Sequence, residues 1–297
     1  MQSGILLMDK PEGVTSFEVV RRARRRLSIR KIGHLGTLDP FATGLLPLCL
    51  KEATKLVPYL IPEPKTYRAV VRLGVTTDTQ DLTGEVVARS ETLPQPEEIR
   101  RAARGFVGEL QQTPPMYSAL RHQGQRLYRL ARRGEVVALK PRKVVVHGLT
   151  VDRIDLPLVT LTVTCSKGTY IRTLAADLGA ALGCGAHLAA LRRLQVGPFR
   201  VEEALPLAAL EEATLAELAS RLIPLDRCLP GMTRVAVDPE QARQMRQGRP
   251  LIWTATDLAP GEPVQVLTDA GLVAVARVQG RAPQALLSPM RVFAPEA

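Results

Sequence analysis

Short apolar runs with β-type patterning alternate with helical stretches along most of this chain, and this alternation constrains its fold most. The β-type runs lie at residues 5–8, 66–73, 143–154 and 158–165. Helical spacing is indicated at 16–27, around 52–60, at 125–133, at 170–182 and in an Ala/Leu/Glu-rich part that follows to about 222. Because strands and helices are interleaved, we expect a mixed α and β fold.

The pattern changes from Arg234 onward, where short strands are separated by Gly and Pro. The segments V-A-V, P-V-Q-V-L and L-V-A-V-A-R-V predict a small separate β unit of about 60 residues. A length of 297 residues also suits one large domain plus a small one. We place the boundary near 230–233, which divides the chain into units at 1–231 and 232–297.

The balance of charge favours a polyanionic partner. The formal net charge is +11 and the sequence pI is near 9.9. Alternatively, the positive charge could serve only to keep the chain soluble. The positions of the cations have to distinguish these two interpretations.

One group of cations lies on the first helix, whose N-cap is predicted at Thr15 or Ser16. The side chains at helical spacing for burial are Phe17, Val20, Ala23 and Leu27. Seven cations and no acid follow within eleven residues, at Arg21, Arg22, Arg24, Arg25, Arg26, Arg30 and Lys31. This surface is a candidate for contact with nucleic-acid phosphates.

A second group of cations lies at 121–143, a stretch that contains eight Lys or Arg residues and only one acid, Glu135. Gly and Pro residues interrupt this stretch, which predicts a protruding element rather than core. Leu127, Leu130 and Ala131 would point inward from its short helix. The cations expected to contact the RNA backbone in the two groups are Arg21, Arg25, Arg30, Lys31, Arg121, Arg126, Arg129, Arg133 and Lys143.

Several protein classes are disfavoured by what the chain lacks. No run of about 18 apolar residues occurs, and the N-terminus turns polar after Met8, too early for a signal peptide, so we expect a cytoplasmic protein without a membrane span. The four cysteines form no C-x-x-C pair, which argues against a disulfide scaffold and a zinc ribbon. Cys184 and His187 form C-x-x-H, but a structural zinc needs four ligands. No metal and no nucleotide cofactor are predicted.

Asp39 lies in the segment G-H-L-G-T-L-D-P at 33–40, which has neither a helical nor a strand period and is expected to be a loop. Pro40 disfavours the α region for Asp39, while Gly33 and Gly36 permit unusual backbone shapes. Such a loop can present one carboxylate in a fixed direction. A plain turn-ending Asp before Pro is the common alternative.

Two further side chains are candidates for a site. Tyr67 begins a strand and is an ordinary strand aromatic by default, but an aromatic near a basic groove can stack on a base. Arg172 lies near the start of a helix, where Arg is usually solvated, but it could instead pair with a buried carboxylate and lower its pKa. The residues alone thus indicate a basic α/β protein that binds nucleic acid, without naming a reaction.

The segment G-H-L-G-T-L-D-P-F-A-T-G-L-L-P at 33–47 strongly resembles the catalytic loop of the TruB-type tRNA pseudouridine synthases. Further motifs of that family occur in order: L-L-M-D-K-P-E-G-V-T-S, K-T-Y-R-A, T-D-T-Q-D-L-T-G, Q-Q-T-P-P-M-Y-S-A-L, C-S-K-G-T-Y-I-R-T and G-C-G-A-H-L-A-A-L-R-R-L. The resemblance spans about 4–194. The tail at 234–292 is more weakly similar to the small β-barrel RNA-binding PUA module.

The resemblance implies an α+β pseudouridine synthase fold, with a central mixed, mainly antiparallel sheet and flanking helices, plus a PUA-like barrel. It implies isomerisation of uridine 55 in the T arm of tRNA without a cofactor. A monomer is the default expectation for the oligomeric state. Asp39 would be the nucleophile, Arg172 its ion-pair partner and Tyr67 the aromatic stacked on the target base. His34 would help to hold the flipped nucleotide, and Tyr170 and Leu191 would complete the uracil pocket.

Alternatives remain at this point. Asp39 could attack uracil C6, attack ribose C1′ or promote proton loss at C2′, and the group that removes the C5 proton is open. A non-catalytic RNA-binding protein would keep the fold without the chemistry. A glycoside hydrolase generally needs two carboxylates, and only Asp39 stands out in the sequence.

Overall fold

The computed structural model describes residues 1–60, 63–118, 120–131, 133–135, 137–254, 258–281 and 285–295. Its helices are α1 (Ser16–Leu27), α2 (Pro96–Arg104), α3 (Leu127–Ala131), α4 (Ile171–Ala181), α5 (Leu207–Glu212), α6 (Leu215–Ser220) and α7 (Pro239–Arg246). The 3₁₀ helices are η1 (Lys51–Lys55), η2 (Val201–Glu203) and η3 (Leu225–Arg227).

The large sheet contains β1 (Gly4–Lys10), β2 (Ile32–His34), β3 (Thr43–Leu50), β4 (Lys65–Leu73), β7 (Gly108–Gln112), β10 (Arg142–Asp155), β11 (Leu158–Cys165), β12 (Ala186–Val196), β13 (Phe199–Arg200), β14 (Leu205–Pro206) and β15 (Ile223–Pro224). Its path is β14-β1-β3-β12-β4-β11-β10-β7, and only the β1–β14 and β3–β12 pairings are parallel. The expected α+β class with a mainly antiparallel mixed sheet is therefore confirmed.

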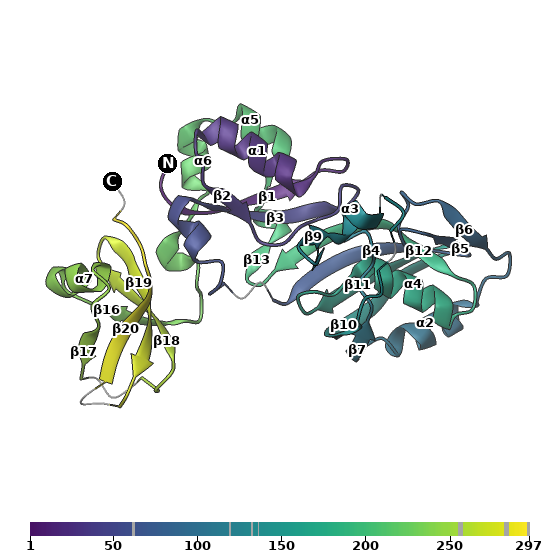
Figure 1. Cartoon of the computed structure of the whole chain (residues 1–297). Helices are drawn as coiled ribbons and strands as arrows, with labels where there is room; N and C mark the ends of the chain where they lie inside the picture. The colour runs from purple at the N-terminus through teal and green to yellow at the C-terminus, as the bar shows by residue number, and fades with distance from the viewer. Residues whose placement is uncertain are drawn as a thin grey trace.

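The large sheet has two halves, each with its own core (Figure 1). On one half α1, α5 and α6 cover β1 and β3, and their shared core includes Val19, Ala23 and Leu210. On the other half α2 and α4 cover β4, β10, β11 and β12. The halves join through β3 and β12, which pair at Arg192↔Thr43 and Arg193↔Gly44. This short parallel junction lies directly after the loop that carries Asp39.

The helix expected after residue 182 is wrong at 186–196, because this segment forms the central strand β12. Its pattern of Ala, Leu and Arg suits a helix locally, but β12 pairs with β4 along its whole length and with β3 at one end. Ladder hydrogen bonds on both sides and burial within the sheet outweigh the helical propensity of these residues. The helical part before residue 222 is limited to α5 and α6.

Other local expectations are also corrected. Around 52–60 the helix is only the 3₁₀ turn η1, followed by turns. The helix at 125–133 is reduced to α3, preceded by the hairpin of β8 (Arg121–His122) and β9 (Gln125–Arg126). The first residues of the predicted loop belong to β2. Thr15 is the N-cap of α1, but Phe17 is 64% exposed and Val19 takes the expected buried position.

A five-stranded sheet forms the end of the chain, with the order β16-β18-β19-β20-β17. Its strands are β16 (Thr233–Ala236), β17 (Leu251–Trp253), β18 (Pro263–Thr268), β19 (Gly271–Gln279) and β20 (Ala285–Val292). The sheet curls around a core closed by Ala242 and Met245 of α7. Leu272, Val275 and Phe293 also enter the core beneath the large sheet, so the two sheets are packed against each other.

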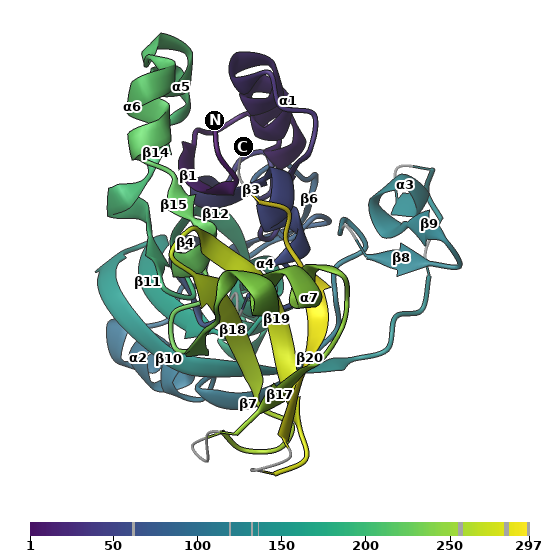
Figure 2. The same cartoon turned by 90° about the vertical axis from the view of Figure 1, so that its left-hand side faces the viewer.

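A two-stranded ribbon of β5 (Val75–Thr77) and β6 (Val86–Arg89) extends beside α4 and β12, away from the C-terminal sheet (Figure 1). Seen from the side, α1 and the element formed by β8, β9 and α3 are separate projections from the body (Figure 2). No helix in the described ranges is long and apolar enough to cross a membrane.

We predict that Gly44→Ala destabilises the fold at the β3–β12 junction. Gly44 has φ +101°, and a Cβ there would lie 2.3 Å from the Arg193 carbonyl oxygen. Overpacking against backbone, added to strain at positive φ, should lower the free energy of unfolding by about 2 kcal/mol or more. Denaturant unfolding measures this loss. Gly13→Ala is the control, because Gly13 has φ +77° but open space around it; equal losses in the two variants would contradict the steric argument.

Candidate active site

The loop that carries Asp39 is held by the segment at 10–16 that precedes it in the chain. The Ser16 hydroxyl accepts a hydrogen bond from the Leu38 amide at 2.8 Å and donates one to the Leu38 carbonyl at 3.0 Å. The Gly13 amide donates to the Pro40 carbonyl at 2.9 Å. Both ends of the Asp39 backbone are thereby anchored to a rigid strand–turn–helix unit.

Lys10 adds a third anchor to this loop. Its buried ammonium donates to the carbonyls of Val14 at 2.6 Å, Pro11 at 2.9 Å and Pro40 at 3.0 Å. Burial lowers the pKa of Lys10 to about 8, and the negative charge of Asp39 opposes this shift. Lys10 therefore holds the loop through the Pro40 carbonyl and also interacts with the charge of Asp39, which the loop carries.

The Arg172 side chain, from the first turn of α4, lies between two carboxylates. Its Nε lies 3.0 Å from Asp39 Oδ2, and its Nη1 lies 3.3 Å from Asp81 Oδ2. Two carbonyls complete its shell, Tyr117 at 2.6 Å and Thr79 at 3.2 Å. Because only 5% of this side chain is exposed, the guanidinium is fixed in one orientation.

Asp81 is the main residue that the sequence analysis missed. Its Oδ1 accepts hydrogen bonds from Thr79 Oγ1 at 2.8 Å, Thr83 Oγ1 at 2.6 Å and the Thr83 amide at 2.9 Å. The motif T-D-T-Q-D-L-T-G held the signal, since a threonine lies two residues to each side of this Asp and can satisfy a buried carboxylate. Only the tertiary structure brings this group to Arg172.

Burial, and not the ion pair, has the largest effect on Asp39. Desolvation raises the pKa of its carboxyl above the ordinary 3.8, and Arg172 gives the strongest opposing effect. The charge of Asp81 raises the pKa further, while Lys10 lowers it. Arg172 acts in the expected direction, because it lowers this pKa, but it offsets only part of the desolvation. The Asp39 side chain nevertheless keeps 37% of its surface exposed.

A cavity of about 290 Å³ opens above this carboxylate. It brings together all the predicted catalytic and pocket residues except His34. Its lining is Gly36, Thr37, Leu38, Asp39, Lys65, Tyr67, Ser118, Leu120, Gly168, Thr169, Tyr170, Ile171, Arg172 and Leu191. A single cavity thus combines an acid, its cation, two aromatic rings and an aliphatic wall.

The two tyrosines of the cavity are held differently. Tyr67 on β4 is 8% exposed, and burial raises the pKa of its phenol, while Arg193 acts in the opposite direction. Tyr170 is fixed through its backbone, because its amide donates to Gln112 Oε1 at 2.7 Å and its carbonyl accepts from Gln112 Nε2 at 3.0 Å. Burial also raises the pKa of Tyr170, so both phenols keep their protons at neutral pH.

Arg193 and Leu191 link the cavity to the sheet junction. Arg193 is almost fully buried, and it donates to the carbonyls of Leu45 at 2.7 Å and Gly36 at 3.0 Å. Leu191 lies on the same strand, opposite Ala69 of β4. His34 lies outside the cavity lining at the end of β2, where burial lowers its pKa.

The structure places several predicted RNA-backbone cations on the surface. Arg21, Arg25, Arg30 and Lys31 are exposed on α1 and the loop after it. Arg133 pairs with Glu135 at 2.8 Å, and Lys143 pairs with Glu109 at 2.7 Å, all four being exposed. The side chains of Arg121, Arg126 and Arg129 lie outside the described residues.

The C-x-x-H pair has ordinary structural partners. His187 Nδ1 donates a hydrogen bond to the Val75 carbonyl at 2.8 Å, and the Cys184 thiol donates to the Gly185 carbonyl at 3.4 Å. Within the described part of the chain, no group of three or more His, Cys, Asp or Glu residues is arranged to hold a metal ion.

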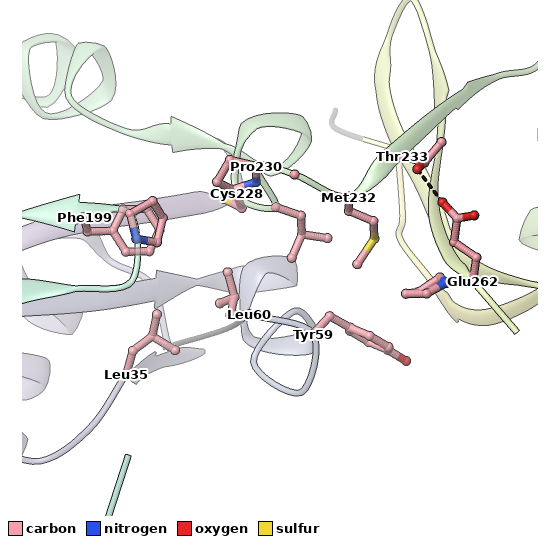
Figure 3. A pocket seen from close by; sticks show the side chains of 13 residues that line it. Leu35, Tyr59, Leu60, Phe199, Cys228, Pro230, Met232, Thr233 and Glu262 are labelled. Carbon is pink, nitrogen blue, oxygen red and sulfur yellow. Dashed lines mark hydrogen bonds between the residues drawn. The ribbon is translucent and has the colours of Figure 1, made fainter. Parts of the chain in front are cut away.

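A second cavity, of about 350 Å³, lies between the two sheets (Figure 3). Its wall is mainly apolar, with Leu35, Tyr59 and Phe199 from the large body and Met232 from the connection. Its carboxylate, Glu262, accepts a hydrogen bond from the Thr233 hydroxyl. This cavity has no counterpart of the Asp39–Arg172 pair.

Known families and curated proteins match most of this chain. A model of the TruB family pseudouridylate synthase N-terminal domain matches residues 24–171, and a model of the tRNA pseudouridylate synthase B C-terminal domain matches residues 172–233. The chain is 47% identical to tRNA pseudouridine synthase B of Ralstonia nicotianae, over 93% of this chain and 91% of that protein. It is 45% identical to the protein of that name from Geobacter sulfurreducens, over 92% of each.

Solved structures of lower sequence identity share the fold of this chain. A Cbf5–Nop10–Gar1 complex contains a chain with a TM-score of 0.73 and 26% identity, which covers 98% of this chain and 85% of that one. An H/ACA RNP bound to a substrate RNA containing 2′-deoxyuridine gives the same TM-score and coverage at 25% identity. By sequence and fold, the chain belongs to the TruB family of pseudouridylate synthases.

Proposed function

We propose that this enzyme isomerises uridine 55 in the T arm of tRNA to pseudouridine, with Asp39 as its nucleophile. The observation that carries the proposal is the 3.0 Å contact between Arg172 and Asp39 at the wall of a cavity with aromatic sides. The names of the bacterial relatives, tRNA pseudouridine synthase B, support tRNA as the substrate.

The chemistry balances without a redox or energy cofactor. The bond between uracil N1 and ribose C1′ breaks, the base turns, and a new bond joins C5 to C1′. The C5 proton is lost and N1 gains a proton, so the product is an isomer of the substrate. The protein has to extrude the base, hold it while it turns, and supply a carboxylate anion.

Each side chain of the cavity has a place in this scheme. Extrusion of the uridine costs a few kcal/mol, which stacking on Tyr67 and hydrogen bonds to the uracil edge offset. Tyr170 and Leu191 form the remaining walls, and His34 supports the flipped nucleotide from outside the cavity. The phenol of Tyr67 stays protonated, so it contacts the base as a neutral ring.

Arg172 keeps Asp39 ready for attack. An isolated carboxylate in this position would protonate more readily, because burial raises its pKa. Arg172 opposes that shift, and its second contact with Asp81 prevents the guanidinium from turning away. Asp81 is thus a positioning residue that acts through Arg172.

The rest of the chain would hold the RNA. We assign residues 1–231 to a catalytic domain with a clamp element at about 121–143, and 232–297 to a PUA-like RNA-binding domain. The exposed cations would contact phosphates, which makes binding sensitive to salt. A tRNA substrate implies a cytoplasmic location, and we take the enzyme to act as a monomer without a metal.

Two rival functions are less well supported. A protein that only binds RNA has no need for an acid beside a buried cation in its cavity. A glycoside hydrolase needs a second carboxyl that can donate a proton to the leaving group. Asp81 is the nearest second carboxylate to Arg172, but it accepts hydrogen bonds on both oxygens and does not line the cavity.

The proposal is tested with an unmodified tRNA transcript carrying tritium at uracil C5. We expect tritium release at the T-loop uridine without added cofactor, and a loss of at least about 10³-fold in Asp39→Asn, because the nucleophile is removed. RNA affinity should stay within about threefold. Asp177→Asn, an exposed acid of α4 outside the cavity, is the matched control. Turnover that survives in Asp39→Asn would refute the assignment of the nucleophile.

A second prediction concerns pH. Because burial raises the pKa of Asp39 above 3.8, its anion is lost at a correspondingly higher pH as the solution is acidified. We expect kcat/KM to fall on the acid side with a midpoint above pH 3.8.

Arg172→Gln removes the cation that opposes this shift, so the midpoint should move to higher pH. Arg172→Lys should move it less, because the positive charge remains. Each profile is scaled to its own maximum, so that the midpoint does not depend on the active fraction. An unchanged or lower midpoint in Arg172→Gln would count against the electrostatic role.

A further inference from the structure

Phe17 is the exception among the phenylalanines of this chain. Of the five, Phe41, Phe199 and Phe293 are buried and Phe106 is partly buried, whereas Phe17 is 64% exposed. The core face of α1 is complete without it, formed by Val19, Val20, Ala23 and Leu27. The exposed ring therefore contributes little to the stability of the described fold.

The position of Phe17 is fixed relative to the cavity. The residue before it, Ser16, holds Leu38 through both of its hydrogen bonds, and Leu38 lines the cavity beside Asp39. The side chain of Thr15 caps the same helix end by accepting a hydrogen bond from the Glu18 amide at 3.0 Å. The Phe17 ring thus projects from a rigid part of the backbone, directly after Ser16, which holds the catalytic loop.

Two cations continue the helix face that begins with this ring. Arg21 and Arg25 follow at intervals of four residues, which places them on one side of α1. Their side chains are 65% and 74% exposed. Arg21 pairs with Glu18, and Arg25 lies 3.8 Å from Glu211, but ion pairs this exposed are weak and give way to a stronger anion.

We propose that Phe17, Arg21 and Arg25 form an RNA-docking stripe, in which the Phe17 ring stacks on an unpaired base next to the target uridine and the two arginines contact phosphates. This inference rests on the proposed function, because it takes the RNA whose uridine enters the cavity as the partner. An exposed aromatic followed by cations suits a splayed nucleic-acid strand, which offers a flat base and a charged backbone together. A second copy of this basic chain would bring like charge to the stripe.

Stacking is tested with a fluorescent ring at position 17. The chain has one tryptophan, Trp253 in the C-terminal sheet, so Trp253→Phe combined with Phe17→Trp leaves the indole at 17 as the only one. We expect an unmodified tRNA transcript to quench this fluorescence in a saturable way. Val87→Trp in the same background is the control, because Val87 is 62% exposed on the remote strand β6. Equal quenching in the two proteins, or none at 17, would overturn the proposal.

Affinity is measured separately by filter binding, which does not require turnover. Phe17→Ala should weaken transcript binding about tenfold, the scale of one lost stacking contact. Phe17→Tyr should restore affinity to within about twofold, whereas Phe17→Leu, which keeps apolar bulk without a π face, should not. Affinity unchanged in Phe17→Ala, or a change in self-association instead, would refute the stripe. Absence of tritium release by the wild-type protein would refute the proposed function and leave this binding result interpretable.

The phosphate contacts of Arg21 and Arg25 are tested by the salt dependence of RNA affinity. Arg21→Gln together with Arg25→Gln should reduce the slope of log affinity against log salt by up to about 2, because each phosphate contact contributes about 1. Arg153→Gln is the control, since Arg153 is 73% exposed on β10 and pairs with Asp155. A slope that changes equally in both proteins would show that the stripe has no special role.

Discussion

The contacts of Arg172 with Asp39 and Asp81 are the interaction on which the candidate site depends. A guanidinium on the first turn of α4 joins the loop before β3 to the turn after β5, two segments that no strand pairing brings together. Burial of Arg172 is tolerated because two carboxylates and two carbonyls satisfy it. The same burial that makes the network rigid raises the pKa of Asp39, and the cation opposes this shift toward the protonated acid.

The sheet supplies the frame for this network. Its two halves have separate cores and meet at a short parallel pairing of β3 with β12, where Gly44 allows the backbones to approach and Arg193 fills the space beside them. The cavity opens between the loop that carries Asp39 on one side and residues of β4, β12 and the start of α4 on the other, including Tyr67, Leu191 and Arg172. The hydrogen bonds of Lys10 and Ser16 then fix that loop against the N-terminal half.

The cations of this molecule are of two kinds, buried ones near the cavity and exposed ones on the surface. Inside, Lys10, Arg172 and Arg193 have defined acceptors and set the geometry of the site. Lys10 and Arg172 also influence the protonation of Asp39. Outside, the exposed cations of the described surface are at most weakly paired, which leaves them available for a polyanion; they include Arg21, Arg25, Arg30, Lys31, Arg133 and Lys143. The cations near the cavity and those on the surface are therefore two separate groups, one held in a rigid interior network and the other solvated.

Through its motifs, the sequence indicated the family and, with it, Tyr67, Tyr170, Arg172 and Leu191, which meet in one cavity. By itself, the sequence also determined several of the longer strands and helices and the loop around Asp39. Local periodicity and capping carry that information over short distances. Only the tertiary structure decided that 186–196 is a central strand, that Phe17 faces solvent and that Asp81 completes the network. It also decided the balance of charge and burial at Asp39. The physical reason is that ladder pairing, desolvation and ion pairs are interactions between segments far apart in the chain, whose free energies no local pattern contains.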